Sequence, residues 1–192
     1  MIERLLNLAT WSATGMTFLV LATGPAPAAE PLPLDIGGDF ALVDQRGQVR
    51  RSEEFDGRLK LVWFGYTECP HACPMALGTI SAALDELGPE SEAVVPLFVT
   101  VDPDHDTPAR MAAHLANFHP SFVGLTGAWD DIAQVRADYR AAAQRIANSG
   151  AFERLFEHTT LIYLMGRGGE PLSLLPAMLP PERIAEIVRG YL

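Results

Sequence analysis

The sequence predicts a single α/β domain in which helices flank a central mixed β-sheet, with an added β-hairpin at the N-terminal end. Two nearly continuous apolar runs, Leu59–Tyr66 and Val94–Val101, are typical of strands covered on both faces, and each is followed by a helical pattern. A further hairpin and a helix end the chain. With 192 residues and 48% apolar composition, the chain is long enough for one well-buried core and a terminal appendage.

The first element predicted in the domain is the hairpin. Residues Gly38–Asp44 alternate and are followed by a turn, and a second arm begins near Gln48. The strand over Leu59–Tyr66 then runs into a loop that contains both cysteines of the chain. A helix is expected over Met75–Leu87, where apolar residues recur at helical spacing and a Gly-Pro pair follows. The cysteines therefore lie between a buried strand and a helix N-terminus.

The middle of the chain repeats the strand-helix order. After Val94–Val101, Thr107 is expected to cap a helix from Pro108 to about Asn117, with proline at the first helical position. Trp129–Tyr139 predicts another helix, opened by two aspartates near its positive end. The stretch Ala141–Ile146 is ambiguous between helix and strand, and we expect a strand there. The order so far is β-α-β-α, followed by one more helix and a short strand.

The last part of the chain predicts a hairpin and a helix. Thr160–Met165 alternates strongly, turns through Gly166–Gly169 and pairs with a strand around Leu172–Leu175. A helix over Glu182–Leu192 follows. A strand-helix-strand core followed by a hairpin and a helix is the order of a thioredoxin-like fold.

Residues 1–29 have the features of a targeting segment. A basic residue precedes the apolar stretch Leu5–Ala22, and a Pro/Ala-rich run follows it. Ala26–Ala28 supplies a small-x-small cleavage pattern, whereas the apolar stretch is nearly long enough to anchor the chain in a membrane. We therefore expect a signal peptide or membrane anchor over 1–29, a linker over 30–37 and the folded domain over 38–192. The domain would then lie on the periplasmic side of an inner membrane, anchored or exported after cleavage.

The overall charge excludes one class of partner. Lys and Arg number 14 against 24 Asp and Glu, giving a net charge of −10. Such a chain has no basic face with which to coat a phosphate backbone, so nucleic acid is not expected as a partner.

Cys69 and Cys73 are the only cysteines, and their surroundings favour metal or redox chemistry. Helix N-termini favour thiolates, and the proline after each cysteine should stiffen the loop. A disulfide between residues four apart would close a short loop and remove little entropy from the unfolded chain. A haem attachment motif is excluded by the three-residue spacing, and a closed zinc site would need a second close pair of ligands. Two thiolates with an imidazole would instead form a soft set of ligands suited to copper.

Several motifs occur together in a fixed order along Gly38–Leu192. They are Phe64-Gly65-Tyr66-Thr67 running into Cys69-Pro70-x-x-Cys73-Pro74, Val101-Asp102-Pro103 with Asp106-Thr107-Pro108, Gly124-Leu125-Thr126-Gly127, and His158-Thr159 ahead of Tyr163-Leu164-Met165. In these motifs the chain resembles the Sco/SenC proteins, which are thioredoxin-like copper-binding factors for assembly of cytochrome c oxidase.

The resemblance implies that Cys69, Cys73 and His158 bind one copper ion, as Cu(I) or Cu(II). It also implies a metallochaperone that helps deliver copper to the binuclear copper centre of cytochrome c oxidase subunit II. Other periplasmic copper chaperones and thioredoxin-like reductants are further expected partners. Two alternatives stay open. The cysteines could be the catalytic pair of a thiol-disulfide reductase that keeps the acceptor cysteines reduced, or the chain could be a copper or redox sensor.

The chain departs from the family pattern at several positions. His71 stands where an acidic residue is usual, Glu157 replaces the common Asp before the ligand histidine, and His105 replaces a usual Arg. His71 could compete for the metal, shift its redox preference or receive it during transfer; the alternative is a solvent-facing loop residue without a metal role. His105 is expected to be a surface residue. Thr159 stands where oxidoreductases of this fold usually place a cis-proline, which argues against a generic disulfide exchanger.

The remaining soft or imidazole side chains are expected to be structural. Met75, Met165 and Met178 do not cluster in the sequence and are assigned to the core or to helix faces. His114 and His119 are assigned to the surface or to capping positions.

Overall fold

The structure is a computed structural model, and it describes residues 31–147 and 154–192. The targeting segment predicted over 1–29 lies outside these residues and stays a prediction. Within the described ranges, no helix is both long enough and apolar enough to cross a membrane.

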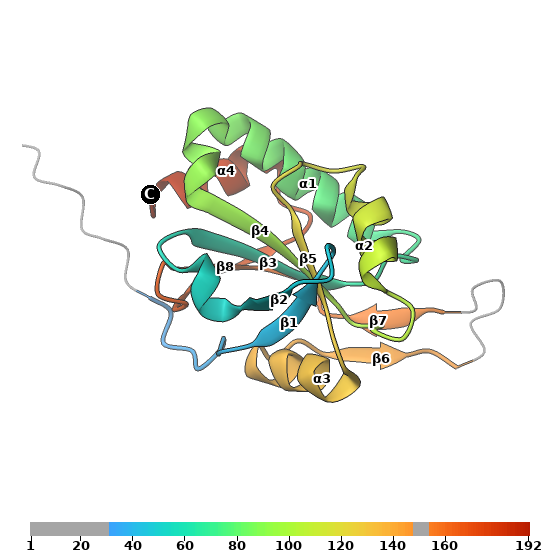
Figure 1. The fold of residues 1–192 in the computed structure, drawn as a ribbon. Coiled ribbons are helices and arrows are strands. Elements are labelled where there is room, and N and C mark those ends of the chain that lie inside the picture. Colours follow the sequence, from blue (N-terminus) through green and yellow to red (C-terminus); the bar gives the residue numbers. More distant parts are fainter. Residues whose placement is uncertain (1–30, 148–153) are drawn as a thin grey trace, which may run out of the picture.

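A mixed seven-stranded sheet forms the centre of the molecule, in the order β2-β1-β5-β4-β3-β8-β9 (Figure 1). Its strands are β1 (Ala41–Asp44), β2 (Val49–Arg51), β3 (Leu59–Gly65), β4 (Val94–Thr100), β5 (Val123–Thr126), β8 (Leu161–Met165) and β9 (Pro171–Pro176). β4 is parallel to both β3 and β5, and the other neighbouring pairs are antiparallel. A separate two-stranded ribbon pairs β6 (Ala143–Arg145) with β7 (Phe156–His158).

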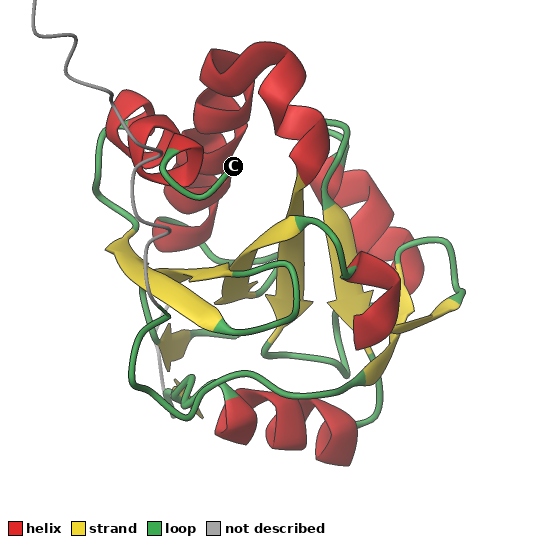
Figure 2. Cartoon of the chain, turned by 90° about the vertical axis from the view of Figure 1, so that its left-hand side faces the viewer, coloured by secondary structure: helices red, strands yellow, loops and turns green. Residues whose placement is uncertain are grey.

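Helices cover both faces of the sheet. Their bounds are α1 (Ala72–Leu87), α2 (Pro108–Leu115), α3 (Trp129–Asp138) and α4 (Pro181–Arg189). α1 and α4 pack against each other on one face, and α3 lies on the other (Figures 1 and 2). Two short 3-10 turns, Ser52–Phe55 and Gly88–Ala93, connect the strands and helices. The layered arrangement confirms the predicted α/β class with a mixed sheet flanked by helices and an N-terminal hairpin.

The two central strands explain why the sequence pattern was so clear. Every residue of β3 and of β4 is buried, because helices cover both faces and other strands cover both edges. Strands in this position need apolar side chains on both faces, which gives a continuous run instead of an alternation. The loop that follows β3 therefore begins from the most completely buried part of the fold.

The structure corrects the prediction in three places. Helix α1 begins at Ala72, earlier than the predicted Met75, so Cys73 lies in the first helical turn. The strands β5 and β7 were not predicted, and His158 is the last residue of β7. The expected strand over Ala141–Ile146 is present in a shorter form as β6.

Part of the predicted linker lies on the domain. The Leu32 N–H donates to the Pro171 carbonyl at 2.7 Å, and the Gly37 N–H donates to the Asp138 carbonyl at 3.0 Å. Ile36 between them is buried. Residues 32–37 thus add to the domain surface before β1 begins.

Candidate metal centre

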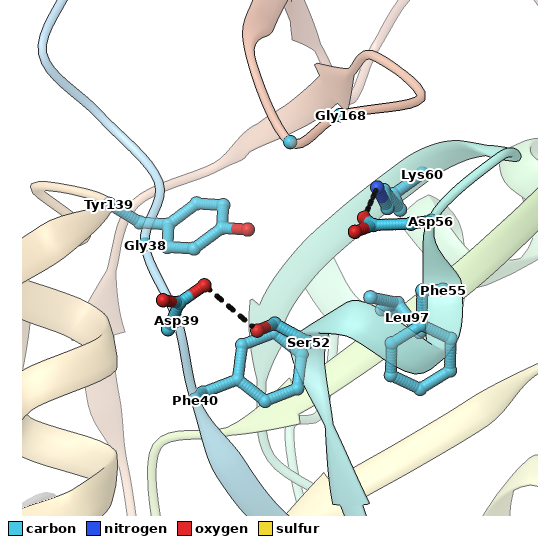
Figure 3. A pocket seen from close by; sticks show the side chains of 11 residues that line it. Gly38, Asp39, Phe40, Ser52, Phe55, Asp56, Lys60, Leu97, Tyr139 and Gly168 are labelled. Atoms are coloured by element: carbon cyan, nitrogen blue, oxygen red, sulfur yellow. Dashed lines mark hydrogen bonds and ion pairs between the residues drawn. The ribbon is translucent and has the colours of Figure 1, made fainter.

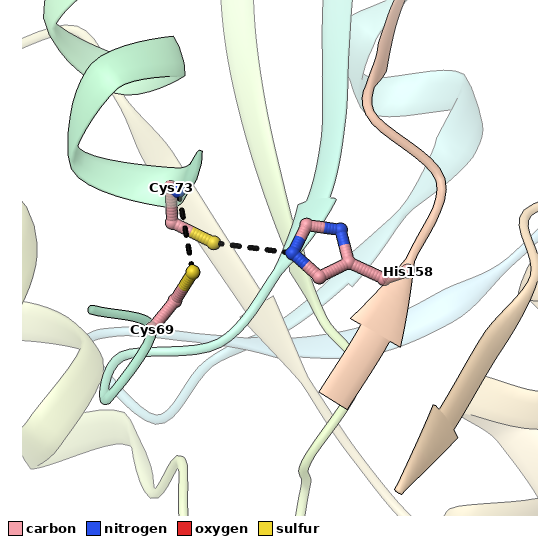
Figure 4. Close-up of side chains that lie close together, drawn as sticks. All are labelled: Cys69, Cys73 and His158. Carbon is pink, nitrogen blue, oxygen red and sulfur yellow. Dashed lines mark hydrogen bonds between the residues drawn. The ribbon is translucent and has the colours of Figure 1, made fainter. Parts of the chain in front are cut away.

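The structure brings Cys69, Cys73 and His158 together from three different elements (Figure 4). Cys69 lies in the loop after β3, Cys73 in the first turn of α1, and His158 at the end of β7. The two Sγ atoms and a ring nitrogen of His158 all lie within 4.8 Å of one another. Both cysteines are free thiols. Across residues 31–147 and 154–192, no other group of three His, Cys, Asp or Glu side chains gathers ligand atoms so closely.

The backbone and two aromatic rings orient His158. Its Nδ1 lies 3.0 Å from the Thr159 carbonyl, which can only accept, so the ring proton is assigned to Nδ1. Nε2 is then left with its lone pair and lies 3.6 Å from Cys73 Sγ. Trp63 and Tyr66 meet the imidazole edge-on, at centroid separations of 5.7 and 6.0 Å. A fixed tautomer and ring orientation are what a metal-binding histidine requires.

The two thiols differ in their proton affinity. A hydrogen bond from the Cys73 thiol lowers the pKa of Cys69 to about 3, and the nearby His158 side chain and the backbone N–H groups of Cys73 and His71 add to this effect. The Cys73 N–H lies 3.3 Å from Cys69 Sγ, at the positive end of α1. Cys73 itself is fully buried, and both the neighbouring Cys69 sulfur and this burial raise its pKa. The site therefore holds one ready thiolate beside one protonated thiol.

The absence of a side chain at Gly65 leaves space beside the Cys73 sulfur. A Cβ at Gly65 would lie 2.6 Å from Cys73 Sγ and 2.7 Å from Trp63 Nε1, so only glycine leaves both atoms their present positions. Trp63 is fully buried, and its Nε1 has no hydrogen-bond partner among the described residues. An indole N–H can only donate, and a thiolate on Cys73 would give it an acceptor. These surroundings suit a sulfur that becomes a thiolate on binding a metal.

Asp106 anchors the start of the cysteine loop. Its carboxylate accepts hydrogen bonds from the N–H and the hydroxyl of Thr67, at 3.1 and 2.6 Å, and from the Thr100 hydroxyl at 2.6 Å. Asp106 is fully buried, and burial raises its pKa. The loop is thereby tied to the end of β4.

An ion pair anchors the segment that carries His158. Arg154 Nη1 lies 2.9 and 2.8 Å from the two carboxylate oxygens of Asp102, which follows β4 and is buried. Phe156 adds a second anchor, since its N–H donates to the Tyr66 hydroxyl at 3.3 Å. Both ligand-bearing segments are therefore fastened to the same end of the central strands.

An open cavity of about 440 Å³ lies between the cysteine loop and β7. Cys69, His71, Glu157 and His158 are among its lining residues. His71 is exposed and does not belong to the three-residue ligand group. His105 instead lies 2.8 Å from a Glu68 carboxylate oxygen, and its side chain is only 15% exposed, so it is more buried than the surface position that was expected.

A smaller cavity of about 110 Å³ lies near the other end of β3 (Figure 3). The Tyr139 hydroxyl points into it, and the Lys60 and Asp56 side chains are bonded to each other on its wall. It contains no cysteine or histidine. The chemistry proposed for the cysteine pair therefore does not involve this cavity.

Sequence reasoning did not find the supporting residues Trp63, Gly65 and Arg154. Trp63 and Gly65 are part of an apolar strand run. Nothing in the run indicates that the Trp63 ring nitrogen and the space at Gly65 lie beside the Cys73 sulfur. Arg154 follows the segment 148–153, and its partner Asp102 lies 52 positions earlier. Only the Gly65 position carried a signal, as part of the Phe64–Thr67 motif.

The model of the SCO1/SenC family matches residues 28–192. The chain belongs to this family. A SCO2-like protein of Rickettsia felis is 33% identical over 156 residues, which cover 81% of this chain and 76% of that protein.

Solved structures agree with the assignment. The copper-bound structure of Bradyrhizobium japonicum ScoI has 38% sequence identity and a TM-score of 0.76, over 82% of this chain and 99% of that one. BsSco, described as a member of the Sco family of cytochrome c oxidase assembly proteins and as containing a disulfide switch, has 21% identity and a TM-score of 0.68, over 84% and 95% of the two chains. The thioredoxin-like fold predicted from the order of elements is thus confirmed.

Thr159 fixes the backbone next to the metal centre. At the position expected for a cis-proline, Thr159 exchanges two hydrogen bonds with Ala142: its N–H donates to the Ala142 carbonyl, and its hydroxyl accepts from the Ala142 N–H. No cis peptide bond occurs in the described ranges of the chain. These bonds hold the backbone directly after His158.

Proposed function

We propose that this chain is a copper metallochaperone that binds one copper ion through Cys69, Cys73 and His158. The observation that carries the proposal is the convergence of two sulfurs and an imidazole nitrogen within 4.8 Å, in a member of the SCO1/SenC family. Thiolates and imidazole select copper among the common biological metals, and they accept Cu(I) as well as Cu(II). The copper-bound ScoI structure supports the same choice of metal.

The acceptor that we propose is the binuclear copper centre of cytochrome c oxidase subunit II. BsSco is described as one of the family of cytochrome c oxidase assembly proteins, and this chain belongs to the same family. Transfer would proceed by ligand exchange, as acceptor thiolates replace Cys69 and Cys73 on the ion. The open cavity beside the site supports this step, because it leaves Cys69 and His158 accessible from outside.

We further propose that the domain acts on the periplasmic side of the inner membrane. The targeting features of residues 1–29 support this location, either as an anchor or as a cleaved signal peptide. Residues 30–37 connect that segment to the copper-binding domain over 38–192. Other periplasmic copper chaperones, or thioredoxin-like reductants that keep the thiols reduced, are partners compatible with this location.

Anaerobic copper titration tests the proposal. The reduced wild type should bind one copper ion per chain, and Cys73→Ser should lower the affinity by at least about 100-fold because a thiolate ligand is lost. His158→Ala should change the electron paramagnetic and ultraviolet-visible spectra of the Cu(II) form. Unchanged affinity in Cys73→Ser would show that the proposed centre is wrong.

A second candidate, thiol-disulfide reductase, is favoured by the asymmetry of the cysteines. A half-buried thiolate at Cys69 beside a buried, protonated Cys73 is a suitable pair for thiol-disulfide exchange. His158→Ala separates the two functions, since it removes a metal ligand and keeps both thiols. Full support of oxidase assembly by this variant would favour the reductase. Normal oxidase activity in a copper-replete deletion strain would instead favour a sensor.

A further inference from the structure

We propose that His71 and Met75 form an external docking pair for Cu(I), which passes the ion to Cys69 at the edge of the metal centre. The proposal rests on the proposed function, since it assigns an access route to the same centre. Both residues lie at the start of α1, and both lie outside the ligand group of Cys69, Cys73 and His158.

His71 has the most available imidazole of the chain. Its side chain is exposed and has no hydrogen bond or ion pair within the described residues. The other four histidines are engaged: His105 and His119 face carboxylates at 2.8 and 3.8 Å, His114 packs beside two phenylalanine rings, and His158 is bonded to Thr159. The two ring nitrogens of His71 are therefore free to meet a metal ion arriving from solvent.

Met75 places a thioether one helical turn after this imidazole. The Met75 N–H donates to the His71 carbonyl at 3.5 Å, so the turn between the two residues is helical. His71 is the N-cap residue of α1, so the two side chains belong to the same first turn of the helix. Met75 is 50% exposed, so packing in the core does not explain why a methionine stands at this position. Thioether and imidazole are both ligands that Cu(I) accepts.

The position of His71 connects this pair to the metal centre. His71 lines the cavity of about 440 Å³ together with Cys69 and His158. Cys73 is fully buried and cannot be the first group that an ion from solvent encounters. The ligands therefore become available in an order: the exposed pair at the start of α1, then the half-buried Cys69 and His158, then the buried Cys73. The net charge of −10 favours the approach of a cation to any part of this surface.

The transfer is an exchange of ligands without electron transfer. Copper remains Cu(I) throughout. A copper–sulfur bond forms with the Cys69 thiolate as the bond to the Met75 thioether breaks. A second copper–sulfur bond forms with Cys73, whose thiol proton passes to solvent, and the bond to His71 is replaced by one to His158.

Loading kinetics test the proposal on the full chain. The reduced protein is mixed anaerobically with Cu(I) supplied as its bicinchoninate complex, and the loss of the coloured complex is followed by stopped flow. His71→Gln and Met75→Leu should each slow loading by about fivefold or more, because the local concentration of the ion at the site falls. The equilibrium affinity should stay within about twofold of wild type, because no ligand of the final site is changed.

Two control variants match the chemistry of the substitutions. His119→Gln removes an imidazole near the end of α2, and Met178→Leu removes a thioether that is 76% exposed between β9 and α4. Both should load at the wild-type rate. Unchanged rates in His71→Gln and Met75→Leu would overturn the docking pair. So would a loss of affinity equal to the loss of rate, because the two residues would then be ligands of the final site.

A second measurement applies if loading is too fast to resolve. In the variant Cys69→Ser/Cys73→Ser/His158→Ala, Ag(I) should still shift the methyl resonance of Met75 in a methionine-methyl-labelled sample, and adding His71→Gln should weaken that shift. A Met75 resonance that Ag(I) leaves unchanged would overturn the proposal. Failure of the proposed function is recognised separately, since it would appear as wild-type copper binding that Cys73→Ser does not weaken.

Discussion

Buried polar groups are fully hydrogen-bonded near one end of strand β3 and incompletely hydrogen-bonded near the other. Near its start, the Lys60 ammonium is buried and has three partners: an Asp56 carboxylate oxygen at 2.9 Å and the carbonyls of Gly166 and Arg167 at 3.1 Å each. Towards its end, Trp63 Nε1 has no partner among the described residues, and the Cys73 sulfur has an imidazole nitrogen at 3.6 Å. Near the start of β3 the hydrogen-bond network is complete, whereas near its end the Trp63 N–H would need a ligand at Cys73 to be paired.

The same strand thus contains a buried polar group that stabilises the fold, Lys60, and one whose partner is missing from the described residues, Trp63. Fully paired buried groups stabilise a fold, whereas each unpaired one costs about 1–3 kcal/mol. An unpaired group in a well-packed region is therefore kept for a reason other than stability. At the proposed metal centre that reason would be a thiolate-bound ion, which would give the Trp63 N–H an acceptor at Cys73. Substitutions at the two ends should consequently affect different measurements.

The largest expected effect is on the chemical reactivity of Cys69. A thiol with an ordinary pKa of about 8.5 loses roughly 1,000-fold in thiolate, and so in alkylation rate, between about pH 8 and pH 5. Cys69, whose pKa is lowered to about 3, should react with iodoacetamide at nearly the same rate across that range. Mass spectrometry of the reduced, metal-free chain at each pH would measure this rate. A tenfold fall per pH unit at Cys69 would contradict the thiolate assignment.

The same shift links the stability of the metal-free chain to pH. The folded-state pKa of Cys69 lies below its unfolded value, so the folded state binds fewer protons between about pH 3 and pH 8.5. Its contribution is fully present above about pH 8.5 and is lost as the pH falls towards about 3. Urea unfolding of wild type and Cys69→Ser at several pH values should show a flatter dependence in the variant.

The next largest effect is expected from Gly65→Ala. The added methyl group would meet the Cys73 sulfur and the Trp63 ring nitrogen below 3 Å, and a Phe98 ring carbon at 2.9 Å. We expect the free energy of unfolding to fall by about 1–3 kcal/mol, as in other overpacked cores, and the copper affinity to fall by about tenfold or more. Urea unfolding and copper competition measure the two changes.

Gly78→Ala is the matched control for this substitution. Gly78 lies within α1, and a Cβ there would have no neighbour within 4 Å. Alanine is favoured over glycine in a helix interior by about 0.5–1 kcal/mol, so this variant should be slightly more stable with unchanged copper affinity. Equal losses in both variants would show that the space around Gly65 has no special role.

These substitutions also show which parts of the molecule a sequence can predict. β3 and β4 were predicted because burial on both faces leaves a continuous apolar pattern in the chain itself. β7 was not, because its three residues are held by pairing with β6 and not by a pattern of their own. The cysteine pair was evident from local chemistry, whereas His158 was found only through its motif. Its position depends on the distant Arg154–Asp102 ion pair, which no local pattern indicates.

At the completed end of β3, Lys60→Met should reduce stability without affecting copper. The substitution removes three hydrogen bonds made by a buried ammonium, at a cost of about 1–3 kcal/mol in the free energy of unfolding. The Gly166 and Arg167 carbonyls keep backbone donors, the N–H groups of Gly169 and Gly57, and Asp56 is half exposed and can be solvated. Copper affinity should remain within about twofold of wild type, since the metal centre lies beyond the far end of the strand. A parallel loss of affinity would mean that the two ends are coupled, and the contrast drawn between them would be wrong.

The smallest effect is expected from Trp63→Phe, at the incomplete end. Phenylalanine keeps a ring against His158 and deletes the unpaired N–H, so gain and loss of stability should nearly cancel, leaving a change within about 1 kcal/mol. The copper-bound form should respond differently. A hydrogen bond to the Cys73 thiolate worth about 1 kcal/mol corresponds to about 40 mV in a one-electron couple, and its loss should lower the Cu(II)/Cu(I) potential by that order. Potentiometry on both proteins decides the matter: an unchanged potential would mean that the Trp63 N–H stays unpaired when copper is bound, and that the incomplete network is not completed by the metal.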